Sequence, residues 1–212
     1  MFSGIIEATG KIARAESRGG GVRLVVRVPG NLAGLAPGSS LAVNGTCLTV
    51  VEAAGDTLAF DAVGATMDRT LLGSLRSGAR VNLERSLRLG SPVDGHLVTG
   101  HVDGVGTVVS RRPGEGAVWF GIEVPEELVP QIAPRGSVAV DGVSLTVASV
   151  RGRAFEVSIV PYTLDGTLFG EYAPGRRVHL ETDVLAKYVQ RALSKEEGTS
   201  LASLFPETRR EI

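Results

Sequence analysis

The sequence predicts an all-β protein made of two tandem copies of a small closed barrel, followed by one C-terminal helix. Two observations predict this fold. The chain of 212 residues repeats itself at a spacing of almost half its length, and each copy contains short runs of alternating apolar and polar residues. The 28 glycines and 10 prolines favour many tight turns over long helices.

The repeat can be read directly from the sequence. Residues 3–10 match residues 99–106 at an offset of 96, and residues 40–50 match residues 137–147 after a one-residue insertion. Self-similarity at a fixed period indicates that each copy is one structural unit. We therefore expect three parts: a first barrel with its linker (residues 1–96), a second barrel (residues 97–182), and a helix with a tail (residues 183–212).

Each copy is expected to consist of short strands separated by turns. The strands expected from alternation and from turn residues are 22–28, 41–43, 48–51 and 58–63 in the first copy, and 118–124 and 155–160 in the second. Asn44-Gly45 has the composition of a two-residue hairpin turn, and Asp141-Gly142 takes its place in the second copy. Five or six strands in about 90 residues favour a closed barrel, because closure removes exposed strand edges.

Beyond the second copy, apolar residues recur at helical spacing. They are Val184, Leu185, Tyr188, Val189, Ala192 and Leu193. Either Thr182 or Asp183 could cap this helix. Its apolar stripe has two interpretations: it packs on its own barrel, or it joins copies of the chain. A further helical turn is expected over residues 199–205.

Composition excludes several classes of function. The 22 basic and 23 acidic residues give a net charge of −1, which argues against nucleic acid or a membrane surface as a partner. No apolar run is long enough to span a membrane, and the first residues do not resemble a signal peptide. The single cysteine excludes an internal disulfide and fits the reducing cytoplasm. Dinucleotide-binding, phosphate-loop and nucleophile-elbow motifs are missing from the sequence.

Positions at which the two copies differ in a reactive side chain are candidates for chemistry, because one copy can then carry a task that the other lacks. Three such pairs align: Cys47 with Ser144, Ile5 with His101, and Ser86 with Asp183. Each candidate also has a structural interpretation. Cys47 can be a buried apolar group, Ser144 a plain strand residue, His101 a structural hydrogen-bonding group and Asp183 a helix cap.

A metal site is not expected. His96 and His101 are five residues apart, which on a strand places them on opposite faces. No cluster of cysteines accompanies them.

Four segments resemble a known family. They are residues 1–5 (MFSGI), 44–50 (NGTCLTV), 95–104 (GHLVTGHVDG) and 141–147 (DGVSLTV). In this order, and with the duplication, residues 1 to about 191 resemble the riboflavin synthases of the alpha-chain type. The resemblance implies two tandem six-stranded antiparallel Greek-key barrels, plus a C-terminal α-helix that joins three chains.

The resemblance also implies an activity. Two molecules of 6,7-dimethyl-8-ribityllumazine exchange a four-carbon unit, which gives riboflavin and 5-amino-6-(D-ribitylamino)uracil without a metal or cofactor. One substrate would lie in a first barrel, and the other in the second barrel of a neighbouring chain of a homotrimer. The differences between the two copies would then separate a donor from an acceptor.

Carried over by motif, the resemblance implies two substrate sites. The first would use Gly4, Ile5, Ile6, Cys47, Leu48, Thr49, Asp61, Ala62, Val63, Gly64, Ala65 and Thr66. The second would use Gly100, His101, Val102, Arg135, Ser144, Leu145, Thr146, Ser158, Ile159, Val160, Pro161, Tyr162 and Thr163. The reaction needs loss of a methyl proton and addition of a nucleophile to a ring carbon, and the candidate catalytic residues are Cys47, His101, Ser144 and Asp183.

The chain departs from the family pattern at some of these positions. Ala65 stands where Glu is common, Tyr162 where His is common, and Arg135 replaces a Lys. Two rival functions stay open: a non-catalytic lumazine- or flavin-binding protein on the same barrels, and a flavin-binding oxidoreductase. Joint retention of the four candidate catalytic residues favours the enzyme.

Overall fold

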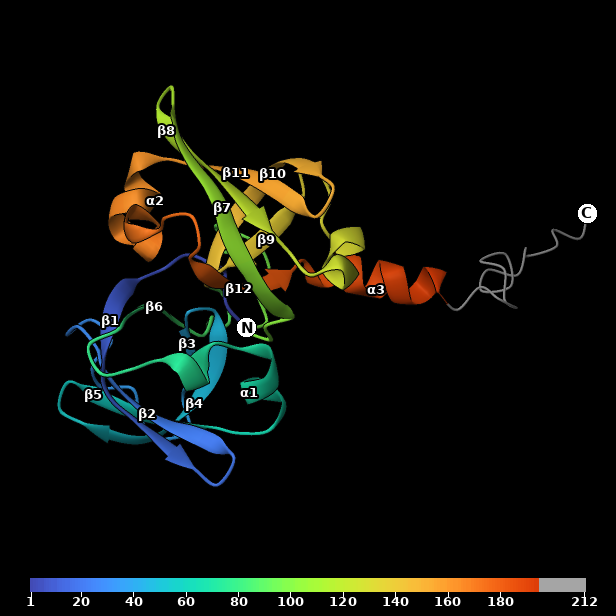
Figure 1. The fold of residues 1–212 in the computed structure, drawn as a ribbon. Coiled ribbons are helices and arrows are strands. Elements are labelled where there is room, and N and C mark those ends of the chain that lie inside the picture. The colour runs from blue at the N-terminus through green and yellow to red at the C-terminus, as the bar shows by residue number, and fades with distance from the viewer. Residues whose placement is uncertain (195–212) are drawn as a thin grey trace, which may run out of the picture.

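The computed structural model describes residues 1–194 and folds them into two closed six-stranded antiparallel barrels (Figure 1). The first, ordered β1-β2-β5-β4-β3-β6, contains β1 (Ala8–Arg18), β2 (Gly21–Arg27), β3 (Ser40–Val43), β4 (Thr46–Ala54), β5 (Thr57–Ala62) and β6 (Arg80–Arg85). The second, ordered β10-β11-β8-β7-β12-β9, contains β7 (Gly104–Gly114), β8 (Ala117–Glu123), β9 (Ser137–Val140), β10 (Val143–Arg151), β11 (Ala154–Ile159) and β12 (Arg177–Thr182). The predicted fold class is confirmed.

Helical segments are short except at the C-terminal end of the described chain. They are α1 (Ala65–Arg69), α2 (Pro161–Gly166) and α3 (Val184–Leu193), with 3-10 helices η1 (Leu72–Ser74), η2 (Glu126–Gln131) and η3 (Leu168–Glu171). α1 with η1, and α2 with η3, connect the last two strands of their barrels. Within residues 1–194, no helix has the length and apolar character needed to cross a bilayer.

Each barrel encloses its own apolar core. On β2, Val22, Leu24 and Val26 are buried, while Arg23 between them forms an ion pair with Asp61. This period of two is the alternation that predicts the strand. Burial of these aliphatic side chains is the main stabilising contribution to each barrel.

The two predicted hairpin turns meet between the barrels. Asn44 and Gly45 have φ angles of 46° and 77°, and Asp141 and Gly142 have φ angles of 45° and 82°, as a type I′ turn requires. A Cβ atom on Gly45 would lie 2.6 Å from the backbone nitrogen of Gly142. Glycine is therefore needed at this position both for its φ angle and for the close approach of the second turn.

A short segment precedes each barrel, and these two segments pair with each other. We call residues 1–6 the first leader segment and residues 95–102 the second leader segment. The Phe2 N–H donates to the Val98 carbonyl (2.7 Å), and the Val98 N–H donates to the Phe2 carbonyl (3.1 Å). Both side chains pack with Ala42 and Ala139 in a small core of their own. This core joins the two barrels.

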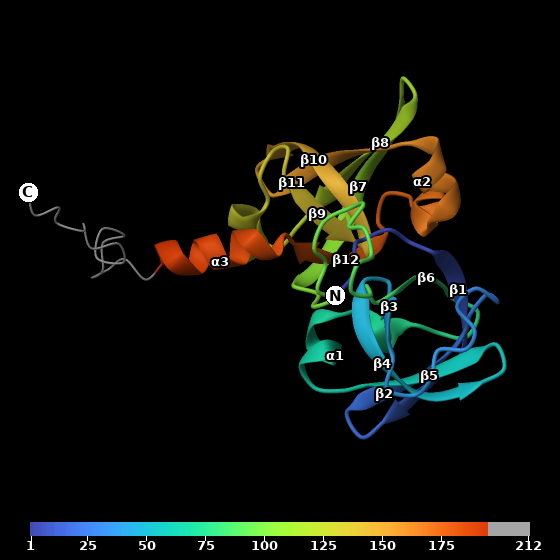
Figure 2. The same ribbon diagram turned by 180° about the vertical axis from the view of Figure 1, so that it is seen from behind.

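The C-terminal helix projects away from the second barrel (Figures 1 and 2). It begins after Asp183, whose side chain accepts a hydrogen bond from the Leu185 N–H (2.9 Å), so the predicted cap is Asp183. The apolar stripe is exposed: Leu185 at 65%, Tyr188 at 72%, and Val189 and Leu193 at 57% each. The interpretation that it packs on its own barrel is therefore wrong. Residues 195–212, with the turn predicted at 199–205, lie outside the described part of the chain.

Candidate functional site

Each leader segment lies against the barrel of the other copy. The Ser144 N–H, at the start of β10, donates to the carbonyl of Gly4 (2.8 Å). The Cys47 N–H, at the start of β4, donates to the carbonyl of Gly100 (2.9 Å). The two substrate sites implied by the family resemblance grouped Gly4 with Cys47 and Gly100 with Ser144. In the structure, Gly4 contacts Ser144 instead, and Gly100 contacts Cys47. The physical reason is the antiparallel contact between the leaders, which directs each of them to the opposite barrel.

Two glycines make this contact possible. Gly4 and Gly100 have φ angles of +79° and +80°, a region that side chains other than glycine rarely adopt. A Cβ atom on Gly4 would lie 2.5 Å from Ser144 Cβ, and one on Gly100 would lie 2.5 Å from Cys47 Cβ. The leader backbone therefore lies directly against the candidate catalytic side chains.

A buried carboxylate anchors the first leader segment. One Glu84 oxygen accepts hydrogen bonds from the Ser3 N–H (2.7 Å) and hydroxyl (2.8 Å), and the other accepts from the Gly4 N–H (3.0 Å). Burial raises the pKa of the Glu84 carboxyl, and these hydrogen bonds oppose that rise.

The second leader segment is anchored in the same way by Glu181. One of its oxygens accepts from the N–H and the hydroxyl of Thr99 (2.6 Å each), and the other accepts from the Gly100 N–H (2.9 Å). Burial again raises the pKa of this carboxyl. The sequence analysis assigned no role to either glutamate.

One candidate pair comes together in a cavity of about 230 Å³, which we call the first-barrel cavity. It is lined by Thr46, Cys47, Ala65, Thr66, Arg69, Thr70, Gly100, His101 and Val102. Cys47 comes from β4, Ala65 and Thr66 from α1, and His101 from the second leader segment. The two differences between the copies at Cys47 and His101 therefore belong to one site.

The second candidate pair is Ser144 with a histidine that sequence reasoning missed. His96 Nδ1 lies 2.7 Å from Ser144 Oγ, and the His96 N–H donates to the Ser3 carbonyl (3.0 Å). His96 Nε2 is buried and has no hydrogen-bond partner among the described residues. Burial lowers the pKa of His96, and the nearby charge of Asp183 partly opposes this. The lowered pKa favours the neutral form of the ring, which lies beside a hydroxyl group.

The sequence analysis did not select His96 because it assumed the wrong local structure. The spacing argument assumed a strand across His96 and His101, whereas residues 95–103 form no regular strand. The alignment of the copies also starts at Ser3 and Thr99, so it gives no counterpart for His96. The signal that could have found it was the family motif at residues 95–104, which contains both histidines.

The other expected site residues fall into three groups. Exposed or half-buried residues are Ile5, Ile6, Thr49, Asp61, Val63, Gly64, Arg135, Thr146, Ser158, Val160, Pro161, Tyr162 and Thr163. Leu48 and Ala62 belong to the first core, and Leu145 and Ile159 to the second, so these four could offer a ligand only their backbone. Asp183 caps α3 through its side chain and lies close enough to influence His96.

Comparison with known proteins agrees with this duplicated arrangement. The lumazine binding domain model matches the chain twice, over residues 3–86 and 99–183. Riboflavin synthase of Mycobacterium tuberculosis is 44% identical over 197 residues, covering 91% of this chain and 98% of that protein. Riboflavin synthase of Bacillus subtilis is 35% identical over 195 residues, covering 92% and 91%.

Solved structures show the same fold. LumP complexed with 6,7-dimethyl-8-(1'-D-ribityl) lumazine has a TM-score of 0.78 at 26% identity, and covers 86% of this chain and 99% of LumP. LumP complexed with riboflavin has a TM-score of 0.80 at 27% identity, with the same coverage. From the two domain matches and the full-length relatives, we conclude that the chain belongs to the riboflavin synthase family of lumazine-binding proteins.

Proposed function

We propose that the protein catalyses the dismutation of two 6,7-dimethyl-8-ribityllumazine molecules to riboflavin and 5-amino-6-(D-ribitylamino)uracil. The observation that carries this proposal is the pair of unlike polar sites on one duplicated fold, Cys47 with His101 and Ser144 with His96. One molecule gains the four carbons that the other loses, so the two sites have different tasks. Family membership supports the same activity.

The polar groups suit the two proton transfers that the reaction needs. A methyl proton must leave one lumazine, and a nucleophile must add to a ring carbon of the other. The neutral imidazole of His96 can accept the Ser144 proton over their 2.7 Å contact, which activates the hydroxyl. Cys47 and His101 offer a thiol and an imidazole at the first-barrel cavity. Holding two substrates face to face supplies a further share of the rate.

We propose a homotrimer in which a neighbouring chain completes each site. The first-barrel cavity of about 230 Å³ is smaller than the roughly 300–1,000 Å³ of typical small-molecule sites, so a further wall is needed. The exposed stripe of α3 supplies a surface that can hold chains together. A second barrel from the next chain could then cover a first barrel.

We also propose that the protein works in the reducing cytoplasm. Cys47 is free, and as the only cysteine it can form no disulfide within the chain. A free thiol at a candidate substrate site keeps its chemistry only where it stays reduced.

The direct test is to incubate the purified protein with 6,7-dimethyl-8-ribityllumazine alone and to follow products by chromatography. We expect one riboflavin for every two lumazines consumed, with no added metal or cofactor. Stable binding of the lumazine with no riboflavin formed would contradict the proposal and favour the non-catalytic binding protein.

A further inference from the structure

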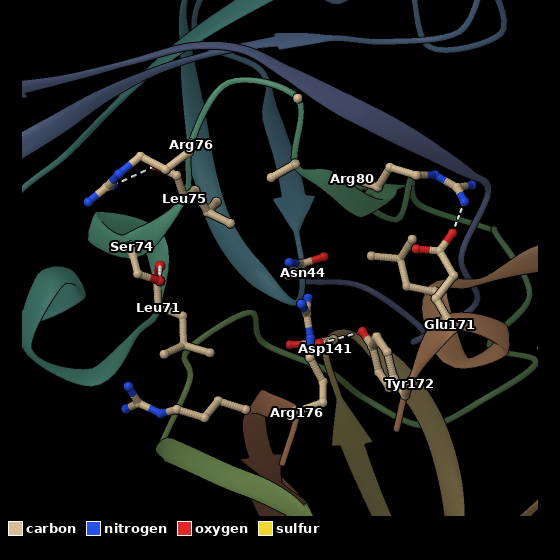
Figure 3. Close-up of a pocket in the computed structure, with 14 residues that line it drawn as sticks. Asn44, Leu71, Ser74, Leu75, Arg76, Arg80, Asp141, Glu171, Tyr172 and Arg176 are labelled. Carbon is tan, nitrogen blue, oxygen red and sulfur yellow. Dashed lines mark hydrogen bonds and ion pairs between the residues drawn. The ribbon is translucent and has the colours of Figure 1, made fainter. Parts of the chain in front are cut away.

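A second and larger cavity lies between the two barrels (Figure 3). Its volume is about 590 Å³, within the range of small-molecule sites. Neither Cys47 nor Ser144 lines it, and neither do His96 and His101. We call it the inter-barrel cavity. Its walls are the connections that precede β6 and β12, and its floor includes the two hairpin turns.

Most of the lining comes in equivalent pairs from the two copies. At the repeat offset of 97, Asn44 corresponds to Asp141, Leu71 to Leu168, Leu75 to Tyr172, and Arg80 to Arg177. The duplicated fold itself therefore creates this cavity.

Two arginines break the equivalence of the copies. Arg76 corresponds to Ala173, and Arg176 corresponds to Ala79. The same connection is therefore made in each copy with alanine at one of these positions, so the barrel does not need either guanidinium group. Each copy adds one cation to the shared cavity that the other copy lacks.

The carboxylates at the cavity are already engaged. Glu171 forms an ion pair with Arg80. Asp141 is buried, and its two oxygens accept hydrogen bonds from the His179 N–H (2.7 Å) and from the Tyr172 hydroxyl (2.5 Å).

Within residues 1–194, three cations at the cavity have no carboxylate partner: Arg76 donates instead to the carbonyls of Gly73 (3.0 Å) and Leu75 (2.8 Å), and Arg176 lies over the ring of Tyr172. Among the described residues, no carboxylate lies within 4.0 Å of the guanidinium groups of Arg76, Arg176 or Arg177. Arg176 reaches into the cavity beside Asn44 and Asp141, and Arg76 lies on the opposite side from Arg80 (Figure 3). The cavity thus has an excess of positive charge in a chain whose net charge is −1.

We propose that the inter-barrel cavity binds an organic phosphate monoester of mononucleotide size. Arginine side chains pair with phosphate oxygens through two parallel N–H donors, and their planar groups also stack on flat rings. Three leucines give the cavity an apolar wall for such a ring: Leu71, Leu75 and Leu168. This site is separate from the lumazine sites and does not depend on the reaction proposed for them.

The test uses adenosine 5′-monophosphate as the probe and adenosine as its uncharged match, measured by titration calorimetry on the full chain at low salt. We expect one monophosphate per chain, with adenosine at least tenfold weaker. The R76A/R176A variant places in each copy the alanine that the other copy has, and we expect it to weaken monophosphate binding at least tenfold. R14A/R18A is the matched control, because it removes the same charge elsewhere and should leave the affinity unchanged.

Three outcomes would overturn the proposal. They are equal affinity for adenosine and its monophosphate, unchanged affinity in R76A/R176A, and loss of monophosphate binding when 6,7-dimethyl-8-ribityllumazine is added in saturating amount. The last result would place the probe in a lumazine site. If the alanine variant did not fold, as judged by circular dichroism, R76Q/R176Q would provide the same comparison with side-chain bulk retained.

Discussion

Cys47 and Ser144 occupy equivalent positions, and within residues 1–194 only Ser144 has an imidazole within hydrogen-bond distance. We expect Ser144→Ala to lower kcat by about 10²- to 10⁴-fold, the usual loss when a proton-transfer group is removed. Cys47→Ser keeps a small polar group and copies the second barrel, so we expect a loss below tenfold. Steady-state kinetics of riboflavin formation measures both. Near wild-type turnover in Ser144→Ala would remove Ser144 from the candidate catalytic groups, and a loss well above tenfold in Cys47→Ser would show that the thiol itself is needed.

His96 leads to a prediction about how the stability of the protein depends on pH. Burial lowers the pKa of His96 in the folded state, so at moderately acidic pH the unfolded chain binds more protons than the folded one. This contribution to stability is complete above the ordinary histidine pKa of about 6.5 and is lost as pH falls towards the lowered value. We expect urea unfolding between pH 5 and 8 to show a steeper loss towards acid in wild type than in His96→Gln. Equal slopes would contradict the assignment.

At the residue scale, comparison of the two copies selected some residues of the candidate site. It selected Cys47, His101 and Ser144 because their chemistry differs from that of their counterparts. It could not select Glu84, since its counterpart Glu181 is identical and identity indicates a role in the fold. Both glutamates anchor leader segments, and their contacts join residues about eighty positions apart. Sequence periodicity carries no information on such contacts.

At the scale of elements, the leader segments depend on two glycines. We expect Gly100→Ala to destabilise the protein by about 1–3 kcal/mol more than Gly34→Ala, which is the typical cost of overpacking. Both residues have positive φ angles, +80° and +90°, so backbone strain is common to the two variants. At Gly100 the new methyl group would collide with Cys47. At Gly34 nothing lies within 4 Å of the added methyl group. Chemical denaturation measures the difference, and equal values would show that the contact is not tight.

The stripe of α3 leads to a prediction about assembly. We expect Leu185→Lys combined with Val189→Lys to convert a trimer into monomers, because two charges would enter the proposed apolar contact. Riboflavin formation should fall at least tenfold if a neighbouring chain completes each site. Light scattering after size-exclusion chromatography measures the mass, and Arg191→Gln is the control within the same helix. A double variant that stayed trimeric would show that another surface holds the chains.

The positions of some strands were predictable because alternation is a local property. The strands expected at residues 22–28 and 118–124 are displaced by one residue from β2 and β8. The exchange of the leader segments was not predictable in this way. It depends on the contact between Phe2 and Val98, which are far apart in the sequence.

At the scale of the whole molecule, the two barrels hold each other by equivalent hydrogen bonds. Asn82 in the first barrel accepts from the Leu168 N–H (3.0 Å) and donates through its side-chain amide to the Asp141 carbonyl (3.0 Å). His179, at the equivalent position of the second barrel, accepts at Nε2 from the Leu71 N–H (2.6 Å) and contacts the Asn44 carbonyl through Nδ1 (2.7 Å).

These partners determine the form of the His179 ring. A carbonyl oxygen can only accept, so Nδ1 carries the proton, and a backbone N–H can only donate, so Nε2 does not. The neutral imidazole therefore performs the same two tasks as the amide of Asn82. Asn82 and His179 therefore make equivalent contacts, because each side chain offers one donor and one acceptor to the opposite barrel.

This equivalence predicts the effect of two substitutions at one position. His179→Ala would leave the part-buried Leu71 N–H and the buried Asn44 carbonyl without partners. We therefore expect it to lower the free energy of unfolding by about 2–6 kcal/mol, at roughly 1–3 kcal/mol for each unpaired group. His179→Asn restores one donor and one acceptor, as Asn82 does in the first barrel, so we expect less than half of that loss. Guanidinium unfolding at one fixed protein concentration measures both, since assembly would otherwise alter the apparent stability. If the two variants lost the same stability, the ring would hold the barrels by packing rather than by these two hydrogen bonds.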